Sequence, residues 1–315
     1  MYYPYLYGRQ SELLALRDVS AELAHWGNVV PVVEPVKDDS GDLIRCLNQL
    51  KNANAKLFLI VNPSHGLFQE DELLAQWTAD TEDHVADSDL TIPTFQISGP
   101  ADDVSSLDSF IAQFAGRPVG IVVRSSDISA VDLEQRVRNL DATVFVHASA
   151  NPRTYLRTLP ADKAVEVVSS FNSQGRNADY FGTEWFTNGH LEFTENGRPG
   201  FSDFALLPNS FKEGGGPAAA VAVHLSYVNN SDGASIWVEH YVSDSTEVGD
   251  GDTASKMSET IAKIHADSSA NPAKYENTIG LTKFLSQHAD ESPTGLATSK
   301  RQQLAHHLAT VASAF

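Results

Sequence analysis

The sequence is poor in cysteine and in basic residues, and it contains no long apolar run. A single cysteine, Cys46, excludes an internal disulfide framework and is typical of a reducing compartment, so we expect a cytoplasmic protein. The 22 lysines and arginines are outnumbered by 41 aspartates and glutamates, which gives a net charge of −19. Such an acidic protein repels nucleic acid and anionic membranes, so neither is expected as a partner. No apolar stretch approaches the length of a membrane span, and no signal peptide is visible.

Several catalytic and metal-binding signatures are also missing. There is no HExxH and no CxxC pair, and no metal is predicted, although His240 and Asp244 share a face of a strand-like run and leave that alternative open. There is no Gly-x-Ser-x-Gly elbow, and the lone cysteine argues against thiol catalysis. The run 213–217, Glu-Gly-Gly-Gly-Pro, lacks the Lys and Ser/Thr of a phosphate loop and indicates a lid or a tight turn. The cofactor is therefore left unknown.

The sequence does contain a regular alternation of short β-rich runs and longer amphipathic runs. Seven such units precede residue 170, and the first strand is expected at 2–6. This alternation indicates parallel βαβ units with right-handed crossovers, and the Val/Ile/Leu-rich strands are typical of sheets covered on both faces. We predict an α/β fold, a closed (β/α)8 barrel of the TIM type, in a single domain over 1–315. A Rossmann-like open sheet is the rival, weakened because no GxGxxG follows the first strand.

The eighth strand is harder to place. Two strong candidates, 220–227 and 236–242, are joined by the turn-rich NNSDGA, and we favour 220–227 as the closing strand. A small hairpin is expected near 190–204. The segment 172–216 is too long for an ordinary crossover and predicts an inserted lid over the barrel rim.

A helical C-terminal tail is expected over 272–315. Its last helix carries Leu304, Leu308 and Val311 at a spacing that forms one apolar stripe. We expect this stripe to pack on the barrel.

Polar residues close several predicted strands, at the ends where active sites of such barrels lie. Glu34, Asn62, Arg124 and His147 follow or end four different strands, so barrel closure would bring them to one rim. Arg124 could bind phosphate or carboxylate, and Glu34 or a histidine could act as general base. Structural roles are the alternative. Asn62 precedes a proline in a turn-forming pair, and Arg124 could pair with Asp127.

The later chain adds further candidates, which the lid and the late strands would carry toward the same mouth. His224, within the favoured eighth strand, is a catalytic candidate or else a satisfied core histidine. The remaining expected substrate-binding residues are Arg176, Asn177, Asp203, His240 and Asp244.

Many of these stretches resemble the "beta family" proteins, which are bacterial and phage-associated chains. The similar stretches include MYYPYLYGRQSELLALRD, VVPVVEPVK, LFLIVNP, RNADYFGTEWFTNGHLEF, GFSDF, GGGPAAAVAVHLSY, HYVSD and KRQQLAHHL. The resemblance implies a TIM-barrel-like fold and a place in mobile or defence-associated gene neighbourhoods, without an established reaction. By motif position it points to Glu34, Asn62, Arg176, Asn177, Asp203, His224, His240 and Asp244.

Two functions follow as hypotheses. The first is an enzyme, a hydrolase acting on a small anionic ligand that is phosphorylated or nucleotide-like. The alternative is a non-catalytic sensor or partner-binding subunit of a multigene antiviral defence module, whose protein partner comes from the same gene neighbourhood. A concave pocket lined by Glu34, Arg124 and His147 would favour the enzyme.

Overall fold

The computed structural model describes residues 1–86, 89–212 and 219–315. The run Glu-Gly-Gly-Gly-Pro at 213–217, expected to be a lid or a turn, lies outside these residues. Contacts group the chain into two compact units, where the sequence analysis expects one domain. The first unit holds 1–13, 20–169 and 189–204, and the second holds 14–19, 170–188 and 205–315.

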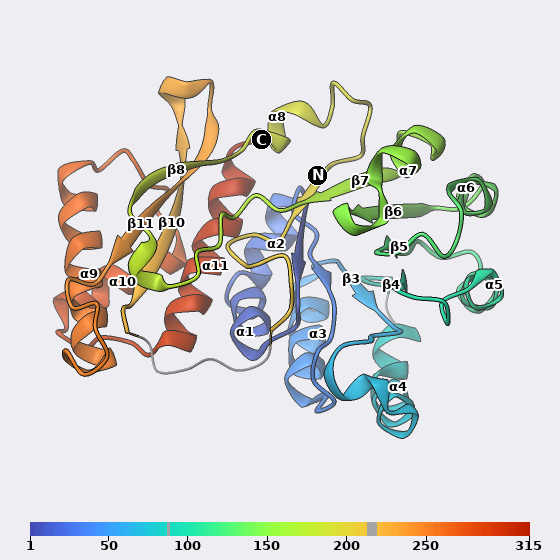
Figure 1. Cartoon of the computed structure of the whole chain (residues 1–315), viewed down its shortest axis with the longest axis horizontal. Coiled ribbons are helices and arrows are strands. Elements are labelled where there is room, and N and C mark those ends of the chain that lie inside the picture. Colours follow the sequence, from blue (N-terminus) through green and yellow to red (C-terminus); the bar gives the residue numbers. More distant parts are fainter. Residues whose placement is uncertain (87–88, 213–218) are drawn as a thin grey trace. The chain divides into compact units, whose positions relative to one another are not determined.

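The first unit is a closed barrel of eight strands, all of them parallel to their neighbours (Figure 1). This confirms the expected (β/α)8 barrel. The strands, in order around the barrel, are β1 (Tyr2–Leu6), β2 (Val32–Val33), β3 (Leu57–Ile60), β4 (Thr91–Ile97), β5 (Val119–Val123), β6 (Ala142–His147), β7 (Ala164–Val168) and β9 (Phe201–Asp203).

Helices alternate with these strands along the chain. They are α1 (Gln10–Asp18, divided between the two units), α2 (Ser20–Trp26), α3 (Gly41–Ala53), α4 (Asp71–Ala86), α5 (Val104–Gln113), α6 (Ala130–Val137), α7 (Pro152–Thr158) and α8 (Gly189–Glu192). Two of them begin at side-chain caps that satisfy free backbone N–H groups. Asp103 accepts from the N–H of Ser106, and Ser129 accepts from that of Asp132. Cys46 is buried in α3, as the helical pattern around it predicts.

Side chains fill the barrel interior below its carboxyl-terminal rim. The rings of Tyr3, Phe58 and Phe145 meet edge-to-face, with centroids 5.1–5.8 Å apart. Gly120 makes this packing possible, because a Cβ there would lie 2.4 Å from Thr94 Oγ1 and 2.8 Å from Phe58 Cδ1. The barrel is therefore packed with aromatic rings, and polar groups enter it at the next inward positions toward the rim.

The closing strand is β9, and neither of the two expected candidates. Residues 222–229 and 235–242 are joined by a short turn, so they can only pair antiparallel, and they do so with each other over eight positions. The three-residue β9 pairs with β1 on one side and β7 on the other. The expected hairpin near 190–204 is also wrong, because residues 189–192 form helix α8.

The second unit is built on an antiparallel sheet of three strands in the order β10-β11-β8 (Figure 1). Strands β10 and β11 supply Val223, Leu225 and Tyr241 to an apolar core that includes Met257 and Phe284. The elements of this unit are β8 (Gly182–Thr187), β10 (Ala222–Asn229), β11 (Ser235–Val242), α9 (Thr253–Ala270), α10 (Ile279–Ala289) and α11 (Leu296–Ser313), with short 3-10 turns at Asn177–Asp179 and Asn230–Asp232.

Helix α11 packs against β10, and its stripe of Leu304, Leu308 and Val311 is buried. The sequence analysis expects this stripe on the barrel, whereas the helix belongs to the core of the second unit. The expected insertion 172–216 supplies β8 to this sheet and β9 to the barrel. That the insertion 172–216 acts as a lid stays a prediction. In the part of the chain that the structure describes, no helix is long and apolar enough to cross a membrane.

Candidate functional site

Three of the four expected rim residues meet at the carboxyl-terminal end of the barrel. Glu34 follows β2, Arg124 follows β5 and His147 ends β6, and each takes an inward position. Tyr5 of β1 lies between them. Its ring centroid is 4.7 Å from that of His147 and 5.2 Å from Arg124 Cζ, and its hydroxyl contacts Glu34. The predicted convergence of Glu34, Arg124 and His147 is therefore confirmed, while their catalytic and binding roles stay predictions.

Glu34 is the centre of this mouth cluster, which we define as Tyr5, Glu34, His65, Arg124 and His147. Its side chain has no exposed surface. The Tyr5 hydroxyl donates to Oε2 over 2.6 Å, Arg124 Nη2 lies 2.8 Å from the same oxygen, and His65 Nε2 lies 3.2 Å from Oε1. A buried carboxylate requires such compensation, because its desolvation is costly without charge pairing and hydrogen bonds. Glu34 therefore forms a buried ion pair with Arg124 at the barrel mouth.

Arg124 stays charged in this buried setting. Burial alone would lower its pKa, but the nearby Tyr5, Glu34 and Tyr7 outweigh burial and raise it. The guanidinium also lies over the rings of Tyr5 and Tyr7, at 5.2 and 6.0 Å from their centroids. Its ion-pair partner is Glu34, so the alternative pairing with Asp127 is wrong.

The two histidines of the mouth cluster are neutral near pH 7. Burial lowers the pKa of His65, and although Glu34 raises it, Arg124 lowers it further. Burial and the charge of Arg124 hold the pKa of His147 well below its ordinary value. Each ring therefore offers one lone pair and one N–H at physiological pH.

The mouth cluster holds polar atoms that lack an aligned hydrogen bond within the described residues. They are Glu34 Oε1, Arg124 Nε, Arg124 Nη2 and His147 Nε2, and Gln96 Oε1 on the neighbouring strand β4 is a fifth. Most buried polar atoms in folded proteins are paired, so a group of exceptions in one place requires an explanation. Together these five atoms offer both hydrogen-bond donors and acceptors.

Asn62 has a structural role instead of a ligand-facing one. Its Nδ2 donates to the carbonyl of Gln96 over 2.9 Å, and its Oδ1 accepts from the backbone N–H of the same residue over 2.8 Å. Nδ2 also lies 3.2 Å from an oxygen of Asp102. The side chain therefore ties the end of β3 to β4, as the turn-forming alternative suggested.

Asp203 lies on the opposite side of its strand from the barrel interior. Tyr3 faces the interior, and its neighbour in the register is Ser202, so Asp203 takes the alternate direction. There the buried carboxylate accepts a hydrogen bond of 2.7 Å from Tyr2. Burial and Asp203 together raise the pKa of Tyr2. The expectation that Asp203 joins the mouth is therefore wrong.

The other expected residues belong to the second unit, each with partners there. His224 and His240 contact each other, with their Nδ1 atoms 2.7 Å apart. The exposed Arg176 pairs with Asp179, Asn177 donates to the carbonyl of Ala220, and Asp244 pairs with Lys263. His240 and Asp244 thus have different partners, which removes the basis for a shared metal site. Among the described residues, no group of three or more histidine, cysteine and acidic side chains could hold a metal ion.

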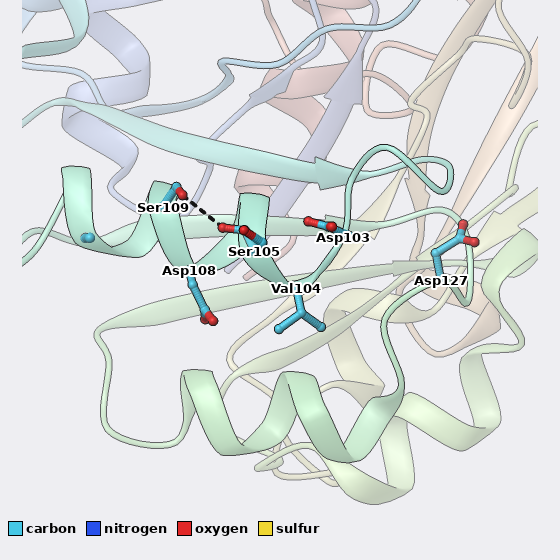
Figure 2. Close-up of a pocket in the computed structure, with 7 residues that line it drawn as sticks. Asp103, Val104, Ser105, Asp108, Ser109 and Asp127 are labelled. Carbon is cyan, nitrogen blue, oxygen red and sulfur yellow. Dashed lines mark hydrogen bonds between the residues drawn. The ribbon is translucent and has the colours of Figure 1, made fainter.

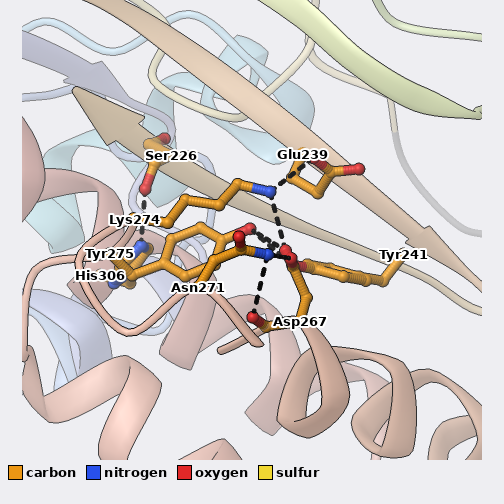
Figure 3. Close-up of polar contacts among 8 residues, drawn as sticks. All are labelled: Ser226, Glu239, Tyr241, Asp267, Asn271, Lys274, Tyr275 and His306. Carbon is orange, nitrogen blue, oxygen red and sulfur yellow. Dashed lines mark hydrogen bonds and ion pairs between the residues drawn. The ribbon is translucent and has the colours of Figure 1, made fainter. Parts of the chain in front are cut away.

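A polar network in the second unit is centred on Asp267 (Figure 3). Asp267 on α9 accepts hydrogen bonds from Tyr241, from Tyr275 over 3.0 Å, from Asn271 over 2.7 Å and from Lys274 over 2.7 Å. Lys274 also reaches Glu239 over 2.8 Å. Every oxygen of Asp267 is used, so we interpret this network as structural.

A surface pocket of the first unit is lined by several carboxylates (Figure 2). Asp103 caps helix α5, and Asp108 forms an ion pair of 2.7 Å with Arg136. These acidic residues have local structural partners, and the pocket is therefore not a candidate site.

Sequence reasoning missed Tyr5, His65 and Gln96. A signal for Tyr5 was present in the opening YYPYLY, where Tyr3, Tyr5 and Tyr7 recur at the period of a strand and mark one inward face. His65 lies in the loop after β3, and no local pattern distinguishes it.

Comparisons with models of known protein families and with curated proteins find no match to this chain. The resemblance to the beta family stays a prediction, and the functional argument depends on the geometry of the site.

Proposed function

We propose that the first unit is an enzyme that binds a small anionic molecule at the barrel mouth and hydrolyses it. One observation carries the proposal: Glu34 Oε1, Arg124 Nε and His147 Nε2 are all buried in the mouth cluster without aligned hydrogen bonds. Barrels of this type place their active sites at the same end, which supports the assignment by analogy.

The binding chemistry follows from the arginine. Arg124 is held in place by Glu34 on one side and by the Tyr5 and Tyr7 rings on its face, so its remaining N–H groups are pre-oriented. A phosphate or carboxylate is the acceptor that best matches a guanidinium. Glu34 Oε1 and Gln96 Oε1 accept hydrogen bonds, so they suit hydroxyl groups on the same molecule.

His147 is the proposed general base. Its low pKa makes it a weak base when only the positive charge of Arg124 is nearby. A bound anion would offset that charge and raise the pKa of His147, so the base would strengthen when substrate is present. His147 Nε2 then takes a proton from water while the water oxygen bonds to the phosphorus or carbonyl carbon. The bond to the leaving group breaks, and the leaving oxygen takes up a proton from solvent.

The test separates binding from turnover. Phosphorylated and carboxylated small molecules, nucleotides and sugar phosphates among them, would be screened for thermal stabilisation of the protein and then for hydrolysis. We expect stabilisation that is lost in Arg124→Lys, which keeps the charge but loses the planar fork. The exposed Arg138→Lys is the matched control and should bind as the wild type does. His147→Gln should bind the ligand and lose hydrolysis by about a hundredfold or more.

Two results would contradict the proposal that the first unit is an enzyme with its site at the barrel mouth. Ligand binding that is unchanged in Arg124→Lys would place the site elsewhere. Binding at the mouth without turnover in the wild type would favour the sensor of the alternative hypothesis. The link to antiviral defence depends on the sequence resemblance alone and is a part of this proposal that neither variant tests.

A further inference from the structure

A second cluster of titratable side chains lies in the three-stranded sheet, one from each strand. His224 of β10 and His240 of β11 are direct cross-strand partners, and their Nδ1 atoms are 2.7 Å apart in a buried setting. His240 Nε2 lies 3.2 Å from Oε1 of Glu184 on β8. The three side chains therefore lie in a line from a carboxylate through two imidazoles, in which the contact between His240 Nε2 and Glu184 Oε1 is close but is not an aligned hydrogen bond.

The nearby carboxylate favours one arrangement of the hydrogens in this line when both histidines are neutral. A carboxylate offers no hydrogen, so the Nε2 atom of His240 that faces Glu184 carries one. The Nδ1 atom of His240 is then a lone pair, and it must accept from Nδ1–H of His224. What remains is a lone pair on Nε2 of His224, since the hydrogen bonds of His224 within the described residues use its backbone N–H and its Nδ1. The line thus ends in a basic atom.

The surroundings hold this line in place and limit its contact with water. Asn172 Nδ2 lies 3.3 Å from Glu184 Oε2 and orients the carboxylate. The ring of Tyr180 lies 4.5 Å from His224 and 5.0 Å from His240, and the ring of Phe171 lies 5.0 Å from His224. His224 keeps 5% of its surface exposed. Aromatic rings therefore lie against a pair of histidines that is almost completely buried.

Charged groups act on the two histidines in opposite ways. Burial, Lys300 and His240 all lower the pKa of His224. Burial also lowers the pKa of His240, but Glu184 and Glu239 raise it. Positive charge is thus less costly on His240 than on His224.

We propose that Glu184, His240 and His224 form a proton relay in which His224 Nε2 accepts a proton from a hydroxyl of an anionic ligand. As Nε2 gains this proton, the Nδ1 proton of His224 passes to Nδ1 of His240. The ligand oxygen keeps the electron pair of its broken O–H bond. The positive charge comes to rest on His240 beside Glu184, away from Lys300. Lys300 Nζ donates to the carbonyl of Leu206 over 3.0 Å, and its charge suits the anionic part of the ligand.

The decisive measurement needs no variant. With 15N-labelled histidine, long-range proton–nitrogen NMR spectra at pH 7 distinguish the two neutral tautomers of each ring. We expect Nδ1–H for His224 and Nε2–H for His240. Nε2–H on His224 or Nδ1–H on His240 would overturn the relay, because the line would then lack its terminal lone pair.

A chemical probe tests the reactivity of the terminal atom. Diethyl pyrocarbonate acylates unprotonated imidazole nitrogen, and mass spectrometry locates the product. His224 should react, while the fully buried His306 and His307 should not. Glu184→Gln removes the carboxylate and should slow the reaction of His224 about tenfold. This factor corresponds to a decrease of about one unit in the pKa of His224. The exposed Glu276→Gln is the control and should react at the wild-type rate.

Inorganic phosphate tests the ligand class. It should slow acylation of His224 in the wild type but not in Lys300→Met. An unreactive His224, or equal rates in the wild type and Glu184→Gln, would overturn the proposal. The barrel-mouth variant His147→Gln should leave these rates unchanged, so failure here and failure of the proposed hydrolase are distinguishable.

Discussion

Two clusters in this protein combine the same chemical groups and differ in how completely the groups are paired. The mouth cluster of the barrel joins a carboxylate, a cation and a tyrosine hydroxyl in Glu34, Arg124 and Tyr5. The network of the second unit joins them in Asp267, Lys274 and two tyrosines (Figure 3). In the network both oxygens of Asp267 are used, whereas in the mouth cluster donors and acceptors are left over.

The degree to which the polar atoms are paired separates a structural role from a functional one more clearly than burial or charge does. Burial lowers the stability of any cluster of this kind unless its polar atoms are paired. A network that pairs all of them is explained by folding alone. A cluster that leaves several unpaired carries a cost that a ligand would offset, which is why we place the proposed active site at the barrel mouth.

The largest expected effect comes from removing the carboxylate of the mouth cluster. Glu34→Ala leaves Arg124 buried without its counter-ion and should lower the free energy of unfolding by about 3–5 kcal/mol, measured by chemical denaturation. Adding Arg124→Met should recover much of this loss, because the uncompensated charge is removed as well. Glu134→Ala is the control, because it removes the partner of the exposed Arg138. An equal loss of stability in Glu34→Ala and Glu134→Ala would contradict a buried ion pair between Glu34 and Arg124.

A smaller effect tests whether the barrel beneath the mouth is as tightly packed as the contacts indicate. Gly120→Ala would place a methyl group 2.4 Å from Thr94 Oγ1, so we expect a loss of about 1–3 kcal/mol in the free energy of unfolding. Gly99→Ala is the control, because a Cβ at Gly99 meets nothing within 4 Å. Equal melting temperatures for the two variants would show a loosely filled interior. Loose packing would then explain the unpaired atoms of the mouth cluster without any ligand.

The smallest effect concerns the network centred on Asp267 and its pH dependence. Burial alone would raise the pKa of Asp267, but hydrogen bonds from Lys274, Tyr241 and Asn271 lower it to about 2. Because the folded pKa lies below the unfolded value of 3.8, the contribution is present above pH 4 and is lost as pH falls toward 2. Asp267→Asn should therefore cost about 1–2 kcal/mol at pH 7 and progressively less below pH 4. A difference that stays constant down to pH 2 would contradict this assignment.

The barrel could be predicted from the sequence because its strands have strong local patterns. Runs such as residues 57–60 and 119–123 are apolar throughout and alternate with amphipathic helices. Closure of such a barrel then brings Glu34, Arg124 and His147 together from strand-end position alone. The convergence of these residues could be predicted without side-chain geometry, because each of them follows or ends a strand with clear boundaries.

The expectations failed where the local pattern is weak or where direction matters. Strand β9 is only Phe-Ser-Asp, too short to compete with the apolar runs after it. Asp203 was misplaced because its direction depends on the register of β9 against β1, which the sequence does not reveal. The expectation that His224 and His240 lie at the mouth depends on 220–227 closing the barrel, whereas β9 closes it.

The position of β9 in the chain has a consequence for biosynthesis. The barrel is sealed by pairing residue 2 with residue 201, so a chain emerging from the ribosome carries seven strands with two open edges until residue 203 has cleared the exit tunnel. Contacts of such long sequence separation form late, and exposed strand edges are prone to pair with other chains. Translation speed and chaperone supply before that point should therefore govern the yield of native protein more strongly than its equilibrium stability does.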